Sequence, residues 1–108
     1  MLMQTIETIN KTISENMAVM LYFSAPTCNV CHALKPKLLK AIESNFKEFE
    51  IVSIDVSVEQ DISAHFNVFA IPTVLIYLGG REFLRKSRHM SIEEVVKEIK
   101  RPYDIMMS

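Results

Sequence analysis

Two cysteines three positions apart are the residues of this sequence with the clearest chemistry. They form the string Cys28-Asn29-Val30-Cys31, and the 108-residue chain has no others. A disulfide between them closes too small a loop to restrict the unfolded chain usefully. In a reducing compartment such a pair is more often catalytic or metal-binding than structural. The pair therefore predicts thiol chemistry.

The place of the pair in the chain favours redox chemistry. Cys28 follows an apolar run and the short turn Ser24-Ala25-Pro26-Thr27, and we expect it to open a helix. Free amides at a helix N-terminus stabilise a thiolate, the form that attacks disulfides. Cys31, one turn further along, can then release a bound partner from Cys28. We expect Cys28 to be the nucleophile and Cys31 the resolving thiol.

Metal and haem sites, or an inert buried pair, are the alternatives. A structural zinc site needs four Cys or His ligands, and His65 and His89 lie far from the pair without ligand spacing. His32 completes a Cys-x-x-Cys-His string, which is also the attachment pattern of c-type haem. No export signal is visible, which argues against haem attachment. We expect neither metal nor cofactor beyond the dithiol. His32 is expected to be an exposed helix residue that tunes Cys28 when protonated.

Apolar residues at helical spacing predict four helices around the pair. They cover residues 2–13, about 28–46, about 57–66 and 92–101. Pro36 falls inside the second helix and removes one backbone hydrogen bond there. Capping boxes are predicted at the starts of the last two helices, from Ser57 with Gln60 and from Ser91 with Glu94. Pro102 is expected to end the last helix, so that residues 103–108 fray.

Four short runs predict strands, at residues 17–23, 50–56, 73–78 and 81–88. The first two have no room for a solvent face, so we expect both to be buried. Gly79-Gly80 separates the last two and predicts a hairpin. Helices that alternate with apolar strands predict an α/β domain whose central sheet is covered on both faces. The basic residues of 81–88 are expected to form a solvated edge, with docking of an acidic partner as the alternative.

Length and charge restrict the class of protein further. The chain is long enough for one domain, residues 1–108, and 49% of its residues are hydrophobic, which argues against disorder. Twelve Lys and Arg against thirteen Asp and Glu give a net charge of −1, which argues against nucleic acid binding. Residues 16–34 lack charge but contain polar residues, so they are not a membrane span. Residues 1–16 lack the pattern of a signal peptide, and we expect a cytoplasmic monomer.

The chain resembles the thioredoxin family along nearly its whole length. The matching features are the run Phe23–Cys28, the helix proline Pro36, the segment Ile71-Pro72-Thr73 and the turn glycine Gly80. The resemblance implies a thioredoxin-like α/β fold with a central mixed sheet flanked by helices on both faces. It implies a thiol–disulfide oxidoreductase that acts on disulfide-containing proteins and is restored by a reductase similar to thioredoxin reductase or by a small thiol. It also implies a cis bond before Pro72, which leaves the Ile71 backbone free to pair with an extended substrate.

The substrate rim implied by the resemblance is uncharged. It consists of Ala25, Pro26, Thr27, Ile71 and Pro72. Since residues 16–34 contain no Asp, Glu, Lys or Arg, docking should depend on apolar and backbone contacts and vary little with salt.

The sequence departs from the family around the cysteines. Asn29-Val30 replaces Gly-Pro, Tyr22 replaces a buried carboxylate, Ser53 replaces its lysine partner, Thr27 replaces a tryptophan and Arg88 replaces a glycine of the docking surface. We expect Tyr22, Asn29, Val30 and His32 to tune the dithiol. For Tyr22 we expect core packing, with a catalytic acid as the alternative. A phenol with a pKa of about 10 is a poor base at neutral pH. A non-turnover adaptor with a redox-sensing dithiol is the competing hypothesis.

Overall fold

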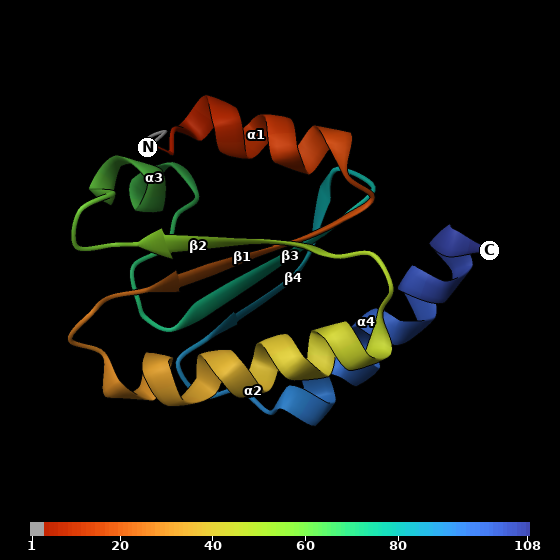
Figure 1. Cartoon of the computed structure of the whole chain (residues 1–108). Coiled ribbons are helices and arrows are strands. Elements are labelled where there is room, and N and C mark those ends of the chain that lie inside the picture. Colours follow the sequence, from red (N-terminus) through yellow and green to blue (C-terminus); the bar gives the residue numbers. More distant parts are fainter. Residues whose placement is uncertain (1–3) are drawn as a thin grey trace.

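The computed structural model describes residues 4–108, and helices and strands alternate along them (Figure 1). The elements are α1 (Ile6–Glu15), β1 (Ala18–Ser24), α2 (Asn29–Asn45), β2 (Glu50–Asp55), α3 (Gln60–His65), β3 (Thr73–Leu78), β4 (Arg81–Ser87) and α4 (Ile92–Met107). The order predicted from the sequence is confirmed. Leu2, which the helical spacing included in the first helix, lies outside the described residues. Within residues 4–108 no helix is long and apolar enough to cross a membrane.

The sheet is mixed, with strand order β2-β1-β3-β4. β1 pairs with β2 in parallel and with β3 in the antiparallel sense, and β3 and β4 form the expected hairpin. Gly79 and Gly80 make the hairpin turn with φ values of 59° and 82°. Glycine adopts this left-handed region without the steric cost that a Cβ atom brings.

Helices cover both faces of the sheet, α1 and α3 on one face and α2 and α4 on the other (Figure 1). Along β1, Val19, Leu21 and Phe23 face the first layer. Met20 and Tyr22 face the second, because successive strand residues point to opposite faces. Every residue from Ala18 to Phe23 is at most 2% exposed, so the predicted buried strand is confirmed except at Met17, which is 47% exposed and precedes β1. The alternation directs Tyr22 toward the layer that contains α2.

β2 is an edge strand, and the prediction that it is buried was wrong. Glu50 and Ser53 are exposed and only Ile54 is fully buried. An apolar run in the sequence does not reveal how many neighbours a strand has in the sheet. β2 has one neighbour, β1, so solvent reaches its other side.

The predicted Ser57–Gln60 capping box was also wrong. Helix α3 begins at Gln60 after Glu59, which makes no side-chain capping bond. The Ser57 amide and hydroxyl instead donate to the Asp55 carboxylate, at 2.9 and 2.6 Å. Of the second predicted capping box the first bond is present, since the Ser91 hydroxyl accepts the Glu94 amide at 3.3 Å, and the return bond from the Glu94 side chain is not among the bonds of this helix start.

The last helix does not end at Pro102, and residues 103–108 do not fray. Helix α4 runs to Met107 with Pro102 inside it. Tyr103 is 5% exposed, its ring lies 4.8 Å from that of Phe46 between centroids, and its hydroxyl accepts the Glu48 amide at 2.9 Å. Burial of this ring stabilises the last helical turns despite the hydrogen bond that proline removes.

Candidate active site

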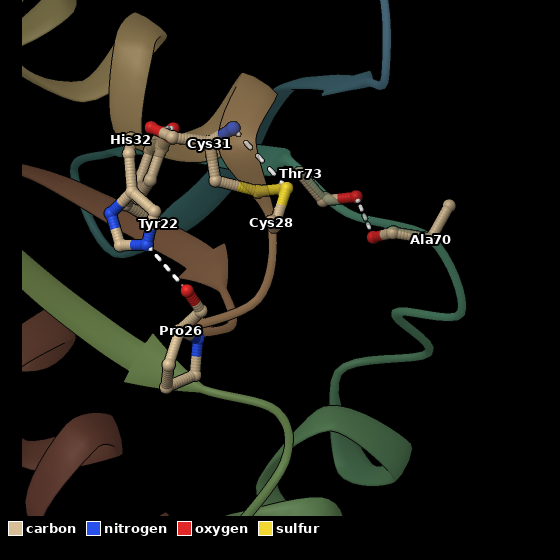
Figure 2. Close-up of a disulfide and its surroundings, with 7 residues drawn as sticks. All are labelled: Tyr22, Pro26, Cys28, Cys31, His32, Ala70 and Thr73. Carbon is tan, nitrogen blue, oxygen red and sulfur yellow. Dashed lines mark hydrogen bonds between the residues drawn. A yellow bond between two sulfur atoms is a disulfide. The ribbon is translucent and has the colours of Figure 1, made fainter.

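The two cysteines lie where β1 passes into α2, and they are joined by a disulfide (Figure 2). Cys28 is the N-cap residue of α2, as predicted, and its amide donates to the Ala25 carbonyl at 3.0 Å. The Cys31 amide donates to the Cys28 sulfur at 3.2 Å. Cys28 is half-buried, whereas Cys31 is 1% exposed. Solvent and partners therefore reach Cys28 more easily than Cys31.

The start of α2 is an environment that favours a thiolate. The helix has 17 residues, and no acidic residue stands in its first turn. Its unpaired amides and partial positive charge act on the Cys28 sulfur, which already accepts one of those amides. Such an environment favours a thiolate over a thiol once the disulfide is reduced.

Tyr22 contacts Cys31 directly. Its side chain is fully buried, and its hydroxyl donates to the Cys31 carbonyl at 2.8 Å. Burial raises the pKa of Tyr22 above its ordinary value, so the phenol stays neutral and acts as a donor. The Lys35 ammonium lies 5.9 Å from the centre of the Tyr22 ring. The sequence analysis did not single out Lys35, although it lies one helical turn beyond Cys31.

His32 is exposed, as expected, and its side chain reaches back to the turn before Cys28. Its Nε2 atom lies 2.8 Å from the Pro26 carbonyl oxygen (Figure 2). Because a carbonyl only accepts, Nε2 is the protonated nitrogen in this contact. Asn29 and Val30 are exposed as well, and the Val30 side chain, 59% exposed, presents an apolar group between the cysteines.

The loop that ends at Pro72 lies beside the cysteines, because Thr73 at the start of β3 pairs with Phe23 near the end of β1. The Ile71–Pro72 peptide bond is cis, as the resemblance implied. The buried Thr73 hydroxyl donates to the Ala70 carbonyl at 2.6 Å and lies 2.9 Å from the Ser87 hydroxyl. Figure 2 shows Ala70 and Thr73 on one side of the disulfide, and Tyr22 and His32 on the other.

The expected rim residues do not all offer surface. Pro26 and Thr27 are exposed and Ile71 is half-buried, but Pro72 and the Ala25 side chain are buried. Next to Ile71 lies a groove of about 320 Å³, which the sequence analysis missed. Its lining is uncharged: Val56, Gln60, Ser63, Ala64, Val68, Phe69, Ala70 and Ile71. Phe69 is 85% exposed at its edge.

Arg85 holds the other end of this loop. Its guanidinium donates to the Phe66 and Asn67 carbonyls at 2.9 and 3.0 Å, just after α3, and also to both oxygens of Glu82. The hydrogen bond from Arg85 holds the pKa of the Glu82 carboxyl below its usual range. The predicted solvated edge at residues 81–88 therefore also makes structural contacts: Arg85 bonds to the end of the loop, and Lys86 pairs with Glu98.

Residues 4–108 contain no cluster of three or more His, Cys, Asp or Glu side chains that could hold a metal ion. The reactive groups described at this site are the two sulfur atoms of Cys28 and Cys31. A disulfide that can open to a dithiol accepts or donates two electrons.

Known proteins resemble this chain in sequence and in fold. The family model described as Thioredoxin matches residues 1–101. A thioredoxin-like protein of Bacillus subtilis, YdfQ, is 29% identical over 94% of this chain and 89% of its own length. A probable protein disulfide-isomerase A4 of Caenorhabditis elegans is 30% identical over 73% of this chain, which is 13% of that protein. Thioredoxin 1 of Thermosipho africanus has a similar structure, with a TM-score of 0.74 and 32% identity over 83% of this chain and 99% of that one.

The family match covers both the disulfide and the loop beside it. Residues 1–101 include every element that positions the cysteines, from β1 through β4. The expected α/β fold, with its mixed sheet between two helical layers, is the fold of these relatives. The chain belongs to the thioredoxin family, and it is a thiol–disulfide oxidoreductase with the pair Cys28 and Cys31 as its dithiol.

Proposed function

We propose that Cys28 attacks the disulfide of a partner protein and that Cys31 resolves the resulting mixed disulfide. The difference in exposure is the observation that carries this assignment: Cys28 is half-buried and caps α2, whereas Cys31 is 1% exposed. An attacking sulfur must reach a sulfur of another molecule. A resolving sulfur needs to reach only its neighbour, three residues away.

The proposed reaction has two thiol–disulfide exchange steps. The Cys28 thiolate forms a bond to one partner sulfur, and the other partner sulfur leaves as a thiolate that takes up a proton. The Cys31 thiol then loses its proton, and its sulfur attacks that of Cys28. The partner sulfur bound to Cys28 is displaced as a thiolate and takes up a proton. The partner gains two electrons and two protons, and the Cys28–Cys31 disulfide described above is the product. A reductase or a small thiol restores the dithiol.

In this scheme an extended partner segment binds across Pro26 and Thr27 on one side and pairs with the Ile71 backbone on the other. The exposed Asn29 and Val30 side chains face that segment and tune the sulfur environment, together with Tyr22 and His32. The uncharged groove next to Ile71 offers room for an apolar side chain of the partner.

Single cysteine variants test the assignment. With an excess of a protein disulfide, Cys31→Ser should accumulate a mixed disulfide at Cys28, whereas Cys28→Ser should form none. Alkylation of the reduced protein at pH 6 to 7 should label Cys28 before Cys31, because only the thiolate reacts. Equal labelling, or a stable mixed disulfide at Cys31, would reverse the roles.

The equilibrium potential of the Cys28–Cys31 couple against glutathione decides the direction of electron flow. A value near about −270 mV supports a reductant, and one above about −200 mV supports an isomerase or oxidant. A reductant requires a reducing compartment, which agrees with the expected cytoplasmic location.

The adaptor hypothesis keeps one observation in its favour. Among residues 4–108 the buried polar side chains other than tyrosine are Ser63 and Thr73, so no buried carboxylate accepts the Cys31 proton. Repeated reduction of insulin disulfides under a strong reductant separates the two hypotheses, since an adaptor stops after one equivalent.

A further inference from the structure

Arg88 lies directly beside Pro72. Strand β4 ends at Ser87, which pairs with Thr73 in the register of the β3–β4 hairpin. The pairing continues one residue beyond the strands, because the amide of Arg88, which follows Ser87, donates to the carbonyl of Pro72, which precedes Thr73, at 2.7 Å. Arg88 is exposed. A long basic side chain therefore starts at the edge of the surface that the partner segment covers.

The backbone at Arg88 is in a conformation that glycine adopts more easily. Its φ is 63°, in the left-handed region where a Cβ atom is crowded. An arginine at this position costs stability that a glycine would not. The position thus has a cationic side chain where the backbone alone favours glycine.

The charge of Arg88 is not neutralised by the rest of the described chain. The ion pairs in residues 4–108 join Arg85 to Glu82, Lys86 to Glu98 and Lys100 to Asp104. The groove beside Ile71 has no charged residue in its lining. Glu93 and Glu94 lie in the first turn of α4, where the helix N-terminus stabilises their charge.

Asp55, the last residue of β2, and Glu59, just before α3, have carboxylates that already accept hydrogen bonds within the chain. Asp55 accepts the Ser57 amide and hydroxyl. Glu59 accepts the Gln4 amide group and the Asp55 backbone amide. Neither of these carboxylates pairs with Arg88, whose guanidinium has no ion-pair partner among residues 4–108.

We propose that Arg88 is a specificity-determining residue that binds a carboxylate of the partner, so that the preferred substrates are disulfides with an acidic residue close to the attacked cysteine. The proposal rests on the dithiol mechanism above, because it requires the partner segment to lie along Ile71 and Pro72. A guanidinium binds a carboxylate through two parallel hydrogen bonds, which gives both affinity and orientation. Such an ion pair makes partner binding depend on salt, at a docking surface that the sequence predicted to be uncharged.

Arg81 provides the matched control. It begins β4, the strand that Arg88 follows, is also exposed, and pairs with Leu78 at the opposite end of the hairpin from Pro72. A general preference of this basic strand for acidic partners depends equally on both arginines. A contact beside the dithiol depends on Arg88 alone.

The test uses four disulfide-containing peptides, which carry a glutamate or a lysine either two residues before or two residues after one cysteine and are otherwise identical. We expect wild-type protein to reduce the best glutamate peptide about tenfold faster in kcat/KM than its lysine counterpart, because the bonds are charge-assisted. Arg88→Gln should reduce this ratio to near one, Arg88→Lys should restore part of it, and Arg81→Gln should leave it unchanged. Higher salt should lower the ratio in the wild type.

Two results overturn the proposal in different ways. If Arg88→Gln keeps the wild-type ratio, or Arg81→Gln lowers it as much, Arg88 is not the determinant, and the dithiol mechanism is unaffected. If the wild type reduces none of these peptides, and Cys31→Ser also fails to form a mixed disulfide, the dithiol mechanism itself is wrong.

Discussion

The two loops that meet at the dithiol are held by different kinds of contact. The loop before Cys28 is fixed by neighbours in the sequence: the Cys28 amide bonds to Ala25, and His32 bonds to Pro26, six residues away. The loop 66–72 is fixed from strand β4, through Arg85 bonds that span 18 and 19 residues. The first loop surrounds the reacting sulfur atoms, whereas the second shapes the surface beside them.

This difference teaches which changes should alter chemistry and which should alter binding. Substitutions around the first loop, including Tyr22 beneath it, act on the proton and sulfur steps. Substitutions that loosen the second loop act on the position of Ile71, and so on the affinity for the partner. A KM-against-kcat comparison is therefore the measurement that separates the two regions.

The largest effect is expected from Tyr22→Asp, on the side of the first loop. A carboxylate buried at this position, with Ser53 and not a lysine at the paired position of β2, should lower the free energy of unfolding by about 3 kcal/mol or more. It should also accept the Cys31 proton, so that a mixed disulfide at Cys28 decays faster at pH 7 than in the wild type. Stopped-flow decay of that species measures the rate, and thermal unfolding measures the stability.

Two further variants sharpen this result. Tyr22→Phe loses only the hydrogen bond to the Cys31 carbonyl and should cost about 1 kcal/mol, with little change in the decay rate. Adding Ser53→Lys to Tyr22→Asp should restore part of the lost stability, because Ser53 pairs with Tyr22 across the sheet. If Tyr22→Asp and wild type decay alike, Tyr22 serves core packing only.

The next effect in size is expected from Thr73→Val, which changes the second loop. The substitution keeps the shape of the side chain but removes its bonds to the Ala70 carbonyl and the Ser87 hydroxyl, at a cost of about 1–2 kcal/mol. KM for a protein disulfide should rise while the alkylation rate of Cys28 stays the same. Thr73→Ser, which keeps the hydroxyl, should retain the wild-type KM; a raised KM there would assign the effect to packing.

The same division explains what the sequence could predict. Cys28 as an N-cap and the Gly79-Gly80 hairpin were correct because their signals lie within a few residues. Pro102 was wrongly expected to end α4, since the burial of Tyr103 depends on an aromatic cluster distant in the sequence. Arg85 was missed as part of the site for this reason too. Its carbonyl partners are backbone groups, which no side-chain pattern in the sequence reveals.

A smaller effect is expected from Arg85→Met, which removes the link from β4 to the end of α3. The side chain is 34% exposed, so its bonds should contribute only about 1 kcal/mol to stability. KM for a protein disulfide should rise about threefold, and kcat should change little, since the sulfur environment is untouched. Arg85→Lys keeps the charge but cannot bond to both carbonyls and Glu82 together, so it should rescue KM only in part. A full rescue would mean that charge alone matters.

The smallest effect is a dependence of the second loop on acid pH. The hydrogen bond from Arg85 lowers the pKa of Glu82 in the folded protein below the value of 4.5 expected for the unfolded chain. The pair therefore stabilises the fold fully above that value, and its contribution is lost as pH falls through the lower folded pKa. Because both side chains are about one-third exposed, we expect less than about 1 kcal/mol. The difference in unfolding free energy between wild type and Glu82→Gln should be constant from pH 7 to 5 and shrink below 4.5. A difference that persists unchanged at pH 3 would mean that Glu82 acts by packing and not by its charge.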